Sequence, residues 1–276
     1  MFENKVIPVD NWVSQFVDWL VDNYRDIFQT IKWPVEKILA GLDIGLNAIH
    51  PIIIILVIGF LAYRYSGKTL AIFSIVTMIL IGLMGLWEET LTTLAMVISA
   101  VLFCAIAGIP IGIAAGRSDR FEMIVRPILD AMQTTPSFVY LIPIVMLFSV
   151  GNVAGVLATI IFALPPIIRL TSLGLRQVHP ELVEAAQAFG ATNFQVLMRV
   201  QIPLAMASIL AGLNQTIMMA LSMVVIAAMI GAGGLGAPVI LGLNTLDIGR
   251  AVTGGLGIVL MAIVLDRVTQ SMAKRK

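Results

Sequence analysis

The stretch Glu184-Ala185-Ala186-Gln187-Ala188-Phe189-Gly190, followed by Ile202-Pro203, lies in or beside a polar segment (176–201) of a chain that is otherwise largely apolar. This segment has a helix-forming composition, and long apolar runs bound it on both sides. A polar helical segment between two membrane spans is expected to lie in water. We therefore expect it to contact a partner on one side of the membrane.

Composition places the rest of the chain in a lipid bilayer. Of the 276 residues, 59% are hydrophobic and 12% are charged, whereas soluble domains have about 45–50% and about 25%. A bilayer admits only helices or closed barrels, and the apolar runs are as long as a spanning helix of about 20 residues. The sequence therefore predicts an all-α integral membrane protein, and its net charge of +1 argues against a nucleic-acid partner.

Hydropathy predicts about seven transmembrane helices. They are placed at 48–64, 69–87, 91–116, 130–150, 152–174, 204–230 and 251–268, with a charged break at 117–126. We divide the chain into an external amphipathic segment (1–47), two accessory spans (48–89) and a main domain (90–270) that contains the polar loop (176–203).

Basic residues fix the expected orientation, because cytoplasmic loops are enriched in Lys and Arg. One set of alternating segments carries Arg64, Lys68, Arg117, Arg120, Arg126, Arg169, Arg176, Arg199, Arg267, Lys274, Arg275 and Lys276. The opposite loops carry Arg250 alone, with Glu88, Glu89 and Asp247. The polar loop and the C-terminus are therefore expected in the cytoplasm, and the N-terminus outside.

Residues 9–31 repeat apolar side chains at helical spacing, with an acidic opposite face. The apolar positions are Val9, Trp12, Val13, Phe16, Trp19, Leu20, Ile27 and Ile31. This pattern predicts a helix that lies in the membrane interface and ends near Pro34. A brace for the first span and a sensor are both open roles for it.

Two motifs that resemble nucleotide-binding loops lack the context they need. Ser66-Gly67-Lys68-Thr69 has Ala62 where a phosphate-binding loop needs glycine, so we interpret it as a tight cytoplasmic turn. The segment Gly231-Ala232-Gly233-Gly234-Leu235-Gly236 follows an apolar helix rather than a strand. A flexible outer gate and a plain helix-ending loop both remain open for it.

Few residues in the sequence could form a metal site or an ion pathway. His50 and His179 are expected on opposite sides of the membrane, so no metal site is predicted. Asp130 and Arg169 lie near span ends, where both reach the cytoplasmic interface. An ion-coupled secondary transporter usually needs carboxylates at mid-membrane, and this alternative class lacks them here.

The Glu-Ala-Ala…Gly pattern resembles the cytoplasmic coupling loop of type I ABC importer permeases. The likeness covers roughly 90–268, and three further segments resemble glycine betaine/proline betaine/choline osmoprotectant permeases. These segments are 129–143 (LDAMQTTPSFVYLIP), 163–169 (ALPPIIR) and 221–231 (LSMVVIAAMIG). The glycine-rich segment is also similar to methionine-type permeases, so permeation of another small solute such as methionine is an alternative.

This resemblance implies a function and its partners. Two permease copies would pair as a homodimer in the cell membrane of a prokaryote, each docking one cytoplasmic ABC ATPase subunit. An extracytoplasmic substrate-binding protein would deliver the solute. ATP would bind the ATPase, so this chain is expected to be a transport subunit without a cofactor or enzymatic activity of its own.

Two groups of residues are candidate sites. The predicted ATPase-coupling residues are Glu184, Ala185, Ala186, Gly190 and Pro203. Gly190 is expected to end a short helix through a left-handed turn, and Pro203 is expected where a new helix starts. The candidate pathway or gate residues are Pro136, Phe138, Tyr140, Pro143, Ser222, Met223, Gly231, Gly233, Gly234 and Gly236. No aromatic cage for a quaternary ammonium is evident, so selection is assigned to the binding protein.

Overall fold

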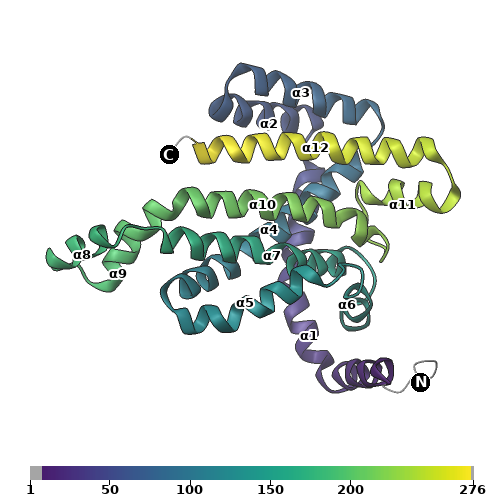
Figure 1. The fold of residues 1–276 in the computed structure, drawn as a ribbon. Coiled ribbons are helices and arrows are strands. Elements are labelled where there is room, and N and C mark those ends of the chain that lie inside the picture. Colours follow the sequence, from purple (N-terminus) through teal and green to yellow (C-terminus); the bar gives the residue numbers. More distant parts are fainter. Residues whose placement is uncertain (1–7, 275–276) are drawn as a thin grey trace, which may run out of the picture.

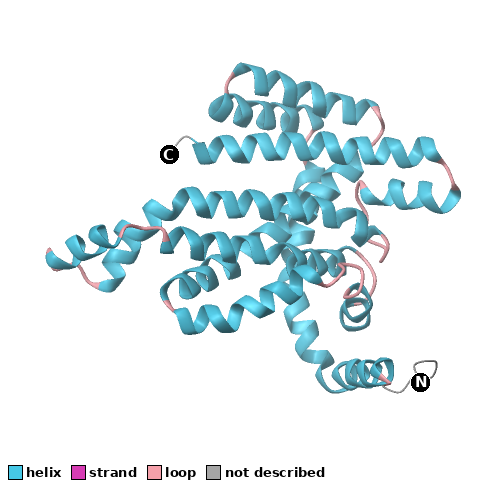
Figure 2. Cartoon of the chain, in the orientation of Figure 1, coloured by secondary structure: helices cyan, strands magenta, loops and turns pink. Residues whose placement is uncertain are grey.

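The structure is a computed structural model that describes residues 8–274, and side chains as far as Ser271. Within this range the chain forms helices joined by turns and loops, without strands (Figures 1 and 2). The helices are α1 (Val9–Ala48), α2 (Pro51–Ser66), α3 (Lys68–Leu83), α4 (Trp87–Arg117), α5 (Asp119–Thr134), α6 (Leu141–Phe148), α7 (Asn152–Arg176), α8 (Pro180–Ala188), α9 (Asn193–Val196), the π-helical turn Leu197–Gln201, α10 (Ile202–Ala228), α11 (Gly236–Thr245) and α12 (Ile248–Lys274).

Helices α4, α7 and α10 form the centre of the molecule. Close approach of α4 to α7 depends on small residues, because a Cβ at Gly108 would lie 2.4 Å from Ile167 Cγ2 and one at Gly112 would lie 2.6 Å from Thr171 Cβ. Glycines one turn apart let membrane helices pack closely. Helix α12 runs alongside α10, and α2 and α3 lie on its other side (Figure 1).

Four helical runs are long and apolar enough to cross a membrane: α4, α7, the run Asn193–Ala228 that contains α10, and α12. The pair α1 and α2, bent by 105°, could be a fifth. The other predicted spans are shorter. Helices α2 and α3 have 16 residues each, about 24 Å, which is less than the hydrocarbon core of about 30 Å.

The predicted single span at 130–150 is wrong, and the charged break predicted at 117–126 is limited to Ser118, between α4 and α5. Helix α5 begins at Asp119, after Ser118 accepts a hydrogen bond from the Phe121 amide, and ends at Thr134. An irregular segment (135–140) and the eight-residue α6 follow. The charges of α5 resemble a loop in hydropathy, but several of them pair with α7 instead of marking an exposed turn.

The helix predicted to end near Pro34 instead continues to Ala48. Val35 and Leu39 are buried in the core, and Phe28 meets Phe148 of α6 edge to face at 5.7 Å. These contacts with the core hold the C-terminal portion of α1 in place although proline removes one helical hydrogen bond. The N-terminal portion keeps Trp12, Phe16 and Trp19 exposed, as the amphipathic pattern predicted.

The two ends of the helix bundle differ in what they carry. Helices α8 and α9 project beyond α7 and α10 at the end where α12 finishes, whereas α11 and the start of α1 lie toward the opposite end (Figure 1). Gly67 makes the predicted tight turn, with φ +94°, between α2 and α3. Arg275 and Lys276 of the predicted basic tail lie outside the described residues.

Candidate functional site

Helix α8 presents a solvent-exposed surface. Pro180 occupies its first turn, a position where proline costs no hydrogen bond. None of its residues is buried, and Glu184 and Ala185 are exposed while Ala186 is half-buried. Phe189, just after the helix, is 93% exposed. Exposed apolar groups rimmed by polar ones are typical of protein–protein contact sites.

Gly190 ends α8 through a Schellman motif. Its φ is +83°, its amide donates to the Gln187 carbonyl at 2.9 Å, and the Ala191 amide donates to the Ala186 carbonyl at 3.0 Å. These two bonds define the motif, which requires a left-handed residue at this position. The expected glycine-dependent helix end is therefore confirmed in the structure.

A continuous helical run connects this loop to the membrane span. Thr192 and Gln195 form a reciprocal capping box that starts α9, with bonds of 2.9 and 3.3 Å. The π-helical turn then leads into α10 without a break. Pro203 lies in the first turn of α10 as expected, and the wider turn before it fits a residue that lacks an amide hydrogen.

The base of the loop is packed against α7. Leu197 and Leu175 are buried in one apolar cluster with Ala205 and Ile209 of α10. In addition, a Cβ at Gly174 would lie 2.6 Å from Ser208 Cβ, so α7 and α10 are in close contact here. The base of the loop is therefore in contact with both α7 and α10.

The candidate pathway residues between Pro136 and Pro143 lie on the irregular segment and the start of α6. Phe138 is 59% exposed. Tyr140 is half-buried, and its hydroxyl donates to the Met132 carbonyl at 3.5 Å, which folds the side chain back onto α5. Pro143 lies in the first turn of α6. Irregular backbone at membrane depth is tolerated where it is packed by protein or lines a cavity.

Ser222 and Met223 lie on different faces of α10. The Ser222 hydroxyl is exposed and donates to the Met218 carbonyl within its own helix. Met223 is fully buried in the apolar cluster that also contains Leu141 and Ile144 of α6. The structure thus places Met223 in the core, rather than on an open surface.

The glycine-rich segment is anchored to two other helices. The Gly233 amide donates to Asn152 Oδ1 of α7 at 2.6 Å, and the Leu235 amide donates to the buried Thr93 Oγ1 of α4 at 2.8 Å. Gly231 and Gly234 have φ of +76° and +80°. Gly231 also lines an apolar groove of about 360 Å³ between α6 and the end of α10.

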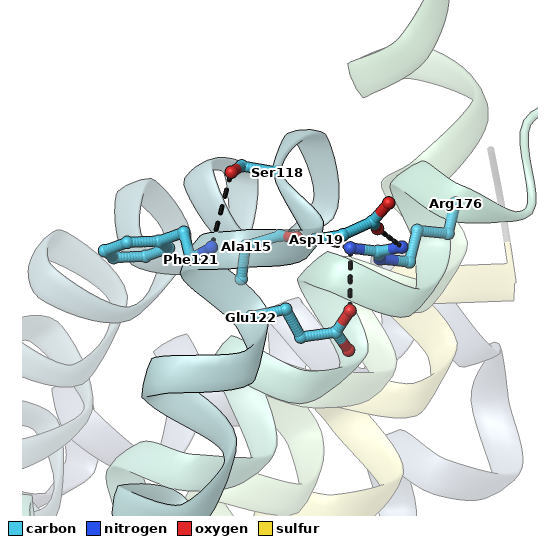
Figure 3. A network of polar contacts seen from close by, with 6 residues as sticks. All are labelled: Ala115, Ser118, Asp119, Phe121, Glu122 and Arg176. Carbon is cyan, nitrogen blue, oxygen red and sulfur yellow. Dashed lines mark hydrogen bonds and ion pairs between the residues drawn. The ribbon is translucent and has the colours of Figure 1, made fainter.

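Two ion-pair sites connect α5 to α7, and hydropathy alone did not reveal them. Arg176 Nη1 lies 2.6 Å from Asp119, and Nη2 lies 2.7 Å from Glu122 and 2.8 Å from the Ala115 carbonyl (Figure 3). Further along the same interface, Arg169 pairs with Asp130 at 2.6 Å. The sequence signal was the presence of both charge signs at helical spacing on 119–130.

Metal chemistry has no site in the part of the chain that the structure describes. No group of three His, Cys, Asp or Glu side chains lies close enough there to hold a metal ion. Cys104 is buried among apolar residues. The geometry therefore defines a helical protein with several helices long enough to span a membrane and an exposed polar loop at one end.

The chain belongs to the family described as binding-protein-dependent transport system inner membrane component, which matches residues 108–276. It is 51% identical to the glycine betaine/proline betaine transport system permease protein ProW of Escherichia coli (strain K12), over 99% of this chain and 77% of that protein. It is 44% identical to the glycine betaine transport system permease protein OpuAB of Bacillus subtilis (strain 168), over 98% of this chain and 96% of that one.

A solved structure shares the fold. The inward-facing MetNI methionine ABC transporter aligns with 66% of this chain and 91% of its own, with a TM-score of 0.60 and 22% identity. At this identity the likeness concerns the fold alone. It supports a type I ABC permease architecture in a multi-pass protein of the inner membrane, and the relatives named above are themselves transport permease subunits.

Proposed function

We propose that this chain is the permease of an ATP-driven importer for glycine betaine or a related quaternary amine osmoprotectant. The observation that carries the proposal is the 51% identity with a glycine betaine/proline betaine permease over nearly the whole chain. Family membership makes a binding protein and an ATPase the expected partners. The 22% likeness to a methionine transporter gives no reason to prefer methionine.

In the proposed mechanism, Glu184, Ala185, Ala186 and Gly190 dock a cytoplasmic ABC ATPase, and Pro203 marks where the docking loop joins α10. The small alanines allow close approach, and the exposed Glu184 offers a charge for an interfacial pair. ATP binds and is hydrolysed on the ATPase. The continuous run from α9 to α10 then transmits its motion to the spans.

The proposed assembly is a homodimer of permeases with two ATPase copies and an extracytoplasmic binding protein. The N-terminus would lie outside and the C-terminus in the cytoplasm, together with α8 and α9. Basic residues at the ends of α4 and α7 support this orientation, because Arg117 and Arg176 lie beside the docking loop end of the bundle.

The test compares two glycines with the same backbone demand. Gly190 and Gly85 have φ of +83° and +73°, and a Cβ at either would meet nothing within 4 Å. The importer is reconstituted in proteoliposomes with its ATPase and binding protein, and uptake of radiolabelled glycine betaine is measured with and without ATP. We expect Gly190→Val to abolish ATP-dependent uptake, and the control Gly85→Val to retain most of it.

Equal uptake by wild type and Gly190→Val, with both inserted in the membrane, would refute the docking role. Uptake driven by an ion gradient without ATP would refute the importer itself and favour a secondary transporter.

A further inference from the structure

A stripe of charges on α5 lies along the edge of its interface with α7. Glu122, Arg126 and Asp130 are spaced four residues apart and therefore share one face of the helix. All three line a cavity of about 330 Å³ whose opposite wall carries Arg169, Ser172 and Arg176 of α7. Pockets for small molecules begin at about this volume, roughly 300 Å³.

The two ion-pair sites lie at different depths of this cavity. Arg176 with Asp119 and Glu122 closes the interface at the end nearest the docking loop (Figure 3). Asp130 lies eleven residues further along α5, which is about 16 Å at 1.5 Å per residue.

The charges at the deeper level are only partly satisfied by one another. Asp130 and Arg169 form one ion pair at 2.6 Å, with side chains 54% and 42% exposed. Arg126, in the same wall, makes no ion pair with any residue that the structure describes. Ser172 is 5% exposed, and its hydroxyl has no hydrogen-bond partner among these residues. The cavity thus offers a carboxylate and two guanidinium groups.

The mixed charges of the cavity suit a ligand that carries both signs. A cation can pair with Asp130 but meets the guanidinium groups of Arg126 and Arg169, and an anion can pair with a guanidinium group but meets Asp130. The Asp130 and Arg169 side chains are about half-exposed, so a solute in the cavity can reach both. A zwitterion replaces the single ion pair by two and adds no net charge, so the cavity can take it up without leaving either side chain unpaired.

We propose that Asp130 and Arg169 form a transient site for the transported zwitterion, in which the substrate carboxylate pairs with Arg169 and its quaternary ammonium approaches Asp130. This inference rests on the proposed function, since it names residues of the permease that contact the imported solute. In the absence of solute, the two side chains pair with each other and keep the route closed.

The first test measures ligand protection of a cysteine in the cavity. Leu173 lines it and is 46% exposed, so Leu173→Cys is placed in a Cys104→Ala background, in the permease–ATPase complex in nanodiscs without the binding protein. Glycine betaine is expected to slow labelling by a maleimide about tenfold. Choline and acetate, which each carry one charge, are expected to protect far less.

Isosteric variants test whether the protection from labelling depends on the Asp130–Arg169 pair. Asp130→Asn and Arg169→Gln should each reduce protection by glycine betaine about tenfold. The matched control is Asp266→Asn, because that carboxylate accepts hydrogen bonds from Asn214 and Gln270 away from the cavity; its protection should equal that of the parent. Equal protection by the three solutes, or no loss in the two isosteric variants, would overturn the site.

Exchanging the charges of Asp130 and Arg169 tests whether the pair contacts the substrate or only holds α5 against α7. Asp130→Arg combined with Arg169→Asp restores an ion pair, so assembly and basal ATP hydrolysis should be retained while glycine betaine import stays low. If the charge-swapped variant imported glycine betaine within about twofold of the wild-type rate, the pair would serve only to hold α5 and α7 together, and the proposal would be overturned. Protection by glycine betaine in a wild-type complex that shows no ATP-driven import would support the site and refute the proposed function.

Discussion

The helical run that contains α10 is flanked by two turns on positive-φ glycines, and their surroundings differ. In the polar loop after α8, a Cβ on Gly190 would meet nothing within 4 Å. At the opposite end, a Cβ on Gly234 would lie 2.5 Å from Thr93 Oγ1, and one on Gly236 would lie 2.6 Å from the Val224 carbonyl. The polar loop needs glycine for its backbone conformation alone, whereas the glycine-rich segment needs it for conformation and for space.

The polar loop and the glycine-rich segment also differ in how they contact the rest of the fold. The base of the loop is packed against α7 and α10 at Leu197, but no residue of α8 is buried, so the side chains of α8 are exposed to solvent. The glycine-rich segment is tied to α4 and α7 through Thr93 and Asn152. Of the two interpretations of the glycine-rich segment, a loop packed into the fold describes this conformation better than a freely flexible gate.

The largest effect is expected from Gly234→Val. A left-handed backbone costs a side-chain-bearing residue about 1–2 kcal/mol, and overpacking against Thr93 adds about 1–3 kcal/mol. The free energy of unfolding should therefore fall by about 2–5 kcal/mol, measured by thermal denaturation of the purified protein. Gly190→Val should show only the backbone contribution to this loss. Equal losses in the two variants would refute the distinction between the two turns.

A smaller effect is expected from Asn152→Leu. It leaves the Gly233 amide without its 2.6 Å acceptor, and an unsatisfied buried donor costs about 1–3 kcal/mol. Asn152→Asp retains the acceptor oxygen and serves as the control. Hydrogen exchange of the Gly233 amide should accelerate in the leucine variant only. Similar acceleration in the aspartate variant would show that the hydrogen bond does not hold the segment.

The smallest effect on folding is expected from Phe189→Ala. This side chain is 93% exposed, so its removal should change the free energy of unfolding by less than about 0.5 kcal/mol. If Phe189 anchors the ATPase, the dissociation constant should rise about fivefold or more, which corresponds to about 1 kcal/mol. Titration of purified ATPase onto permease nanodiscs measures this. An exposed residue far from α8, Leu246→Ala, is the control.

The features that sequence predicted well depend on local rules. The apolar runs became α4, α7 and α12 because length and hydropathy suffice for a long spanning helix. The end of α8 followed from Gly190, since a Schellman motif is set by a few neighbouring residues.

The missed features depend on distant partners. Asp119 and Glu122 suggested a break between spans where α5 begins, and their pairing with Arg176 of α7 could not be seen from the local pattern. Asp119 and Arg176 lie 57 residues apart in the chain. Similarly, Pro34 predicted a helix end that contacts with α6 override. The sequence also did not predict the hydrogen bonds that Asn152 and Thr93 make with the glycine-rich segment. Both residues are distant from it in the chain, and no local pattern connects them to it.

The unbroken run from Asn193 to Ala228 has a mechanical consequence. Its 36 residues make a rod about 54 Å long, nearly twice the hydrocarbon thickness of about 30 Å. A rigid rod of this length would convert a displacement at one end into an opposite displacement at the other. A tilt of about 10° about its midpoint moves each end by about 5 Å in opposite directions, which is enough to separate two side chains that are in contact.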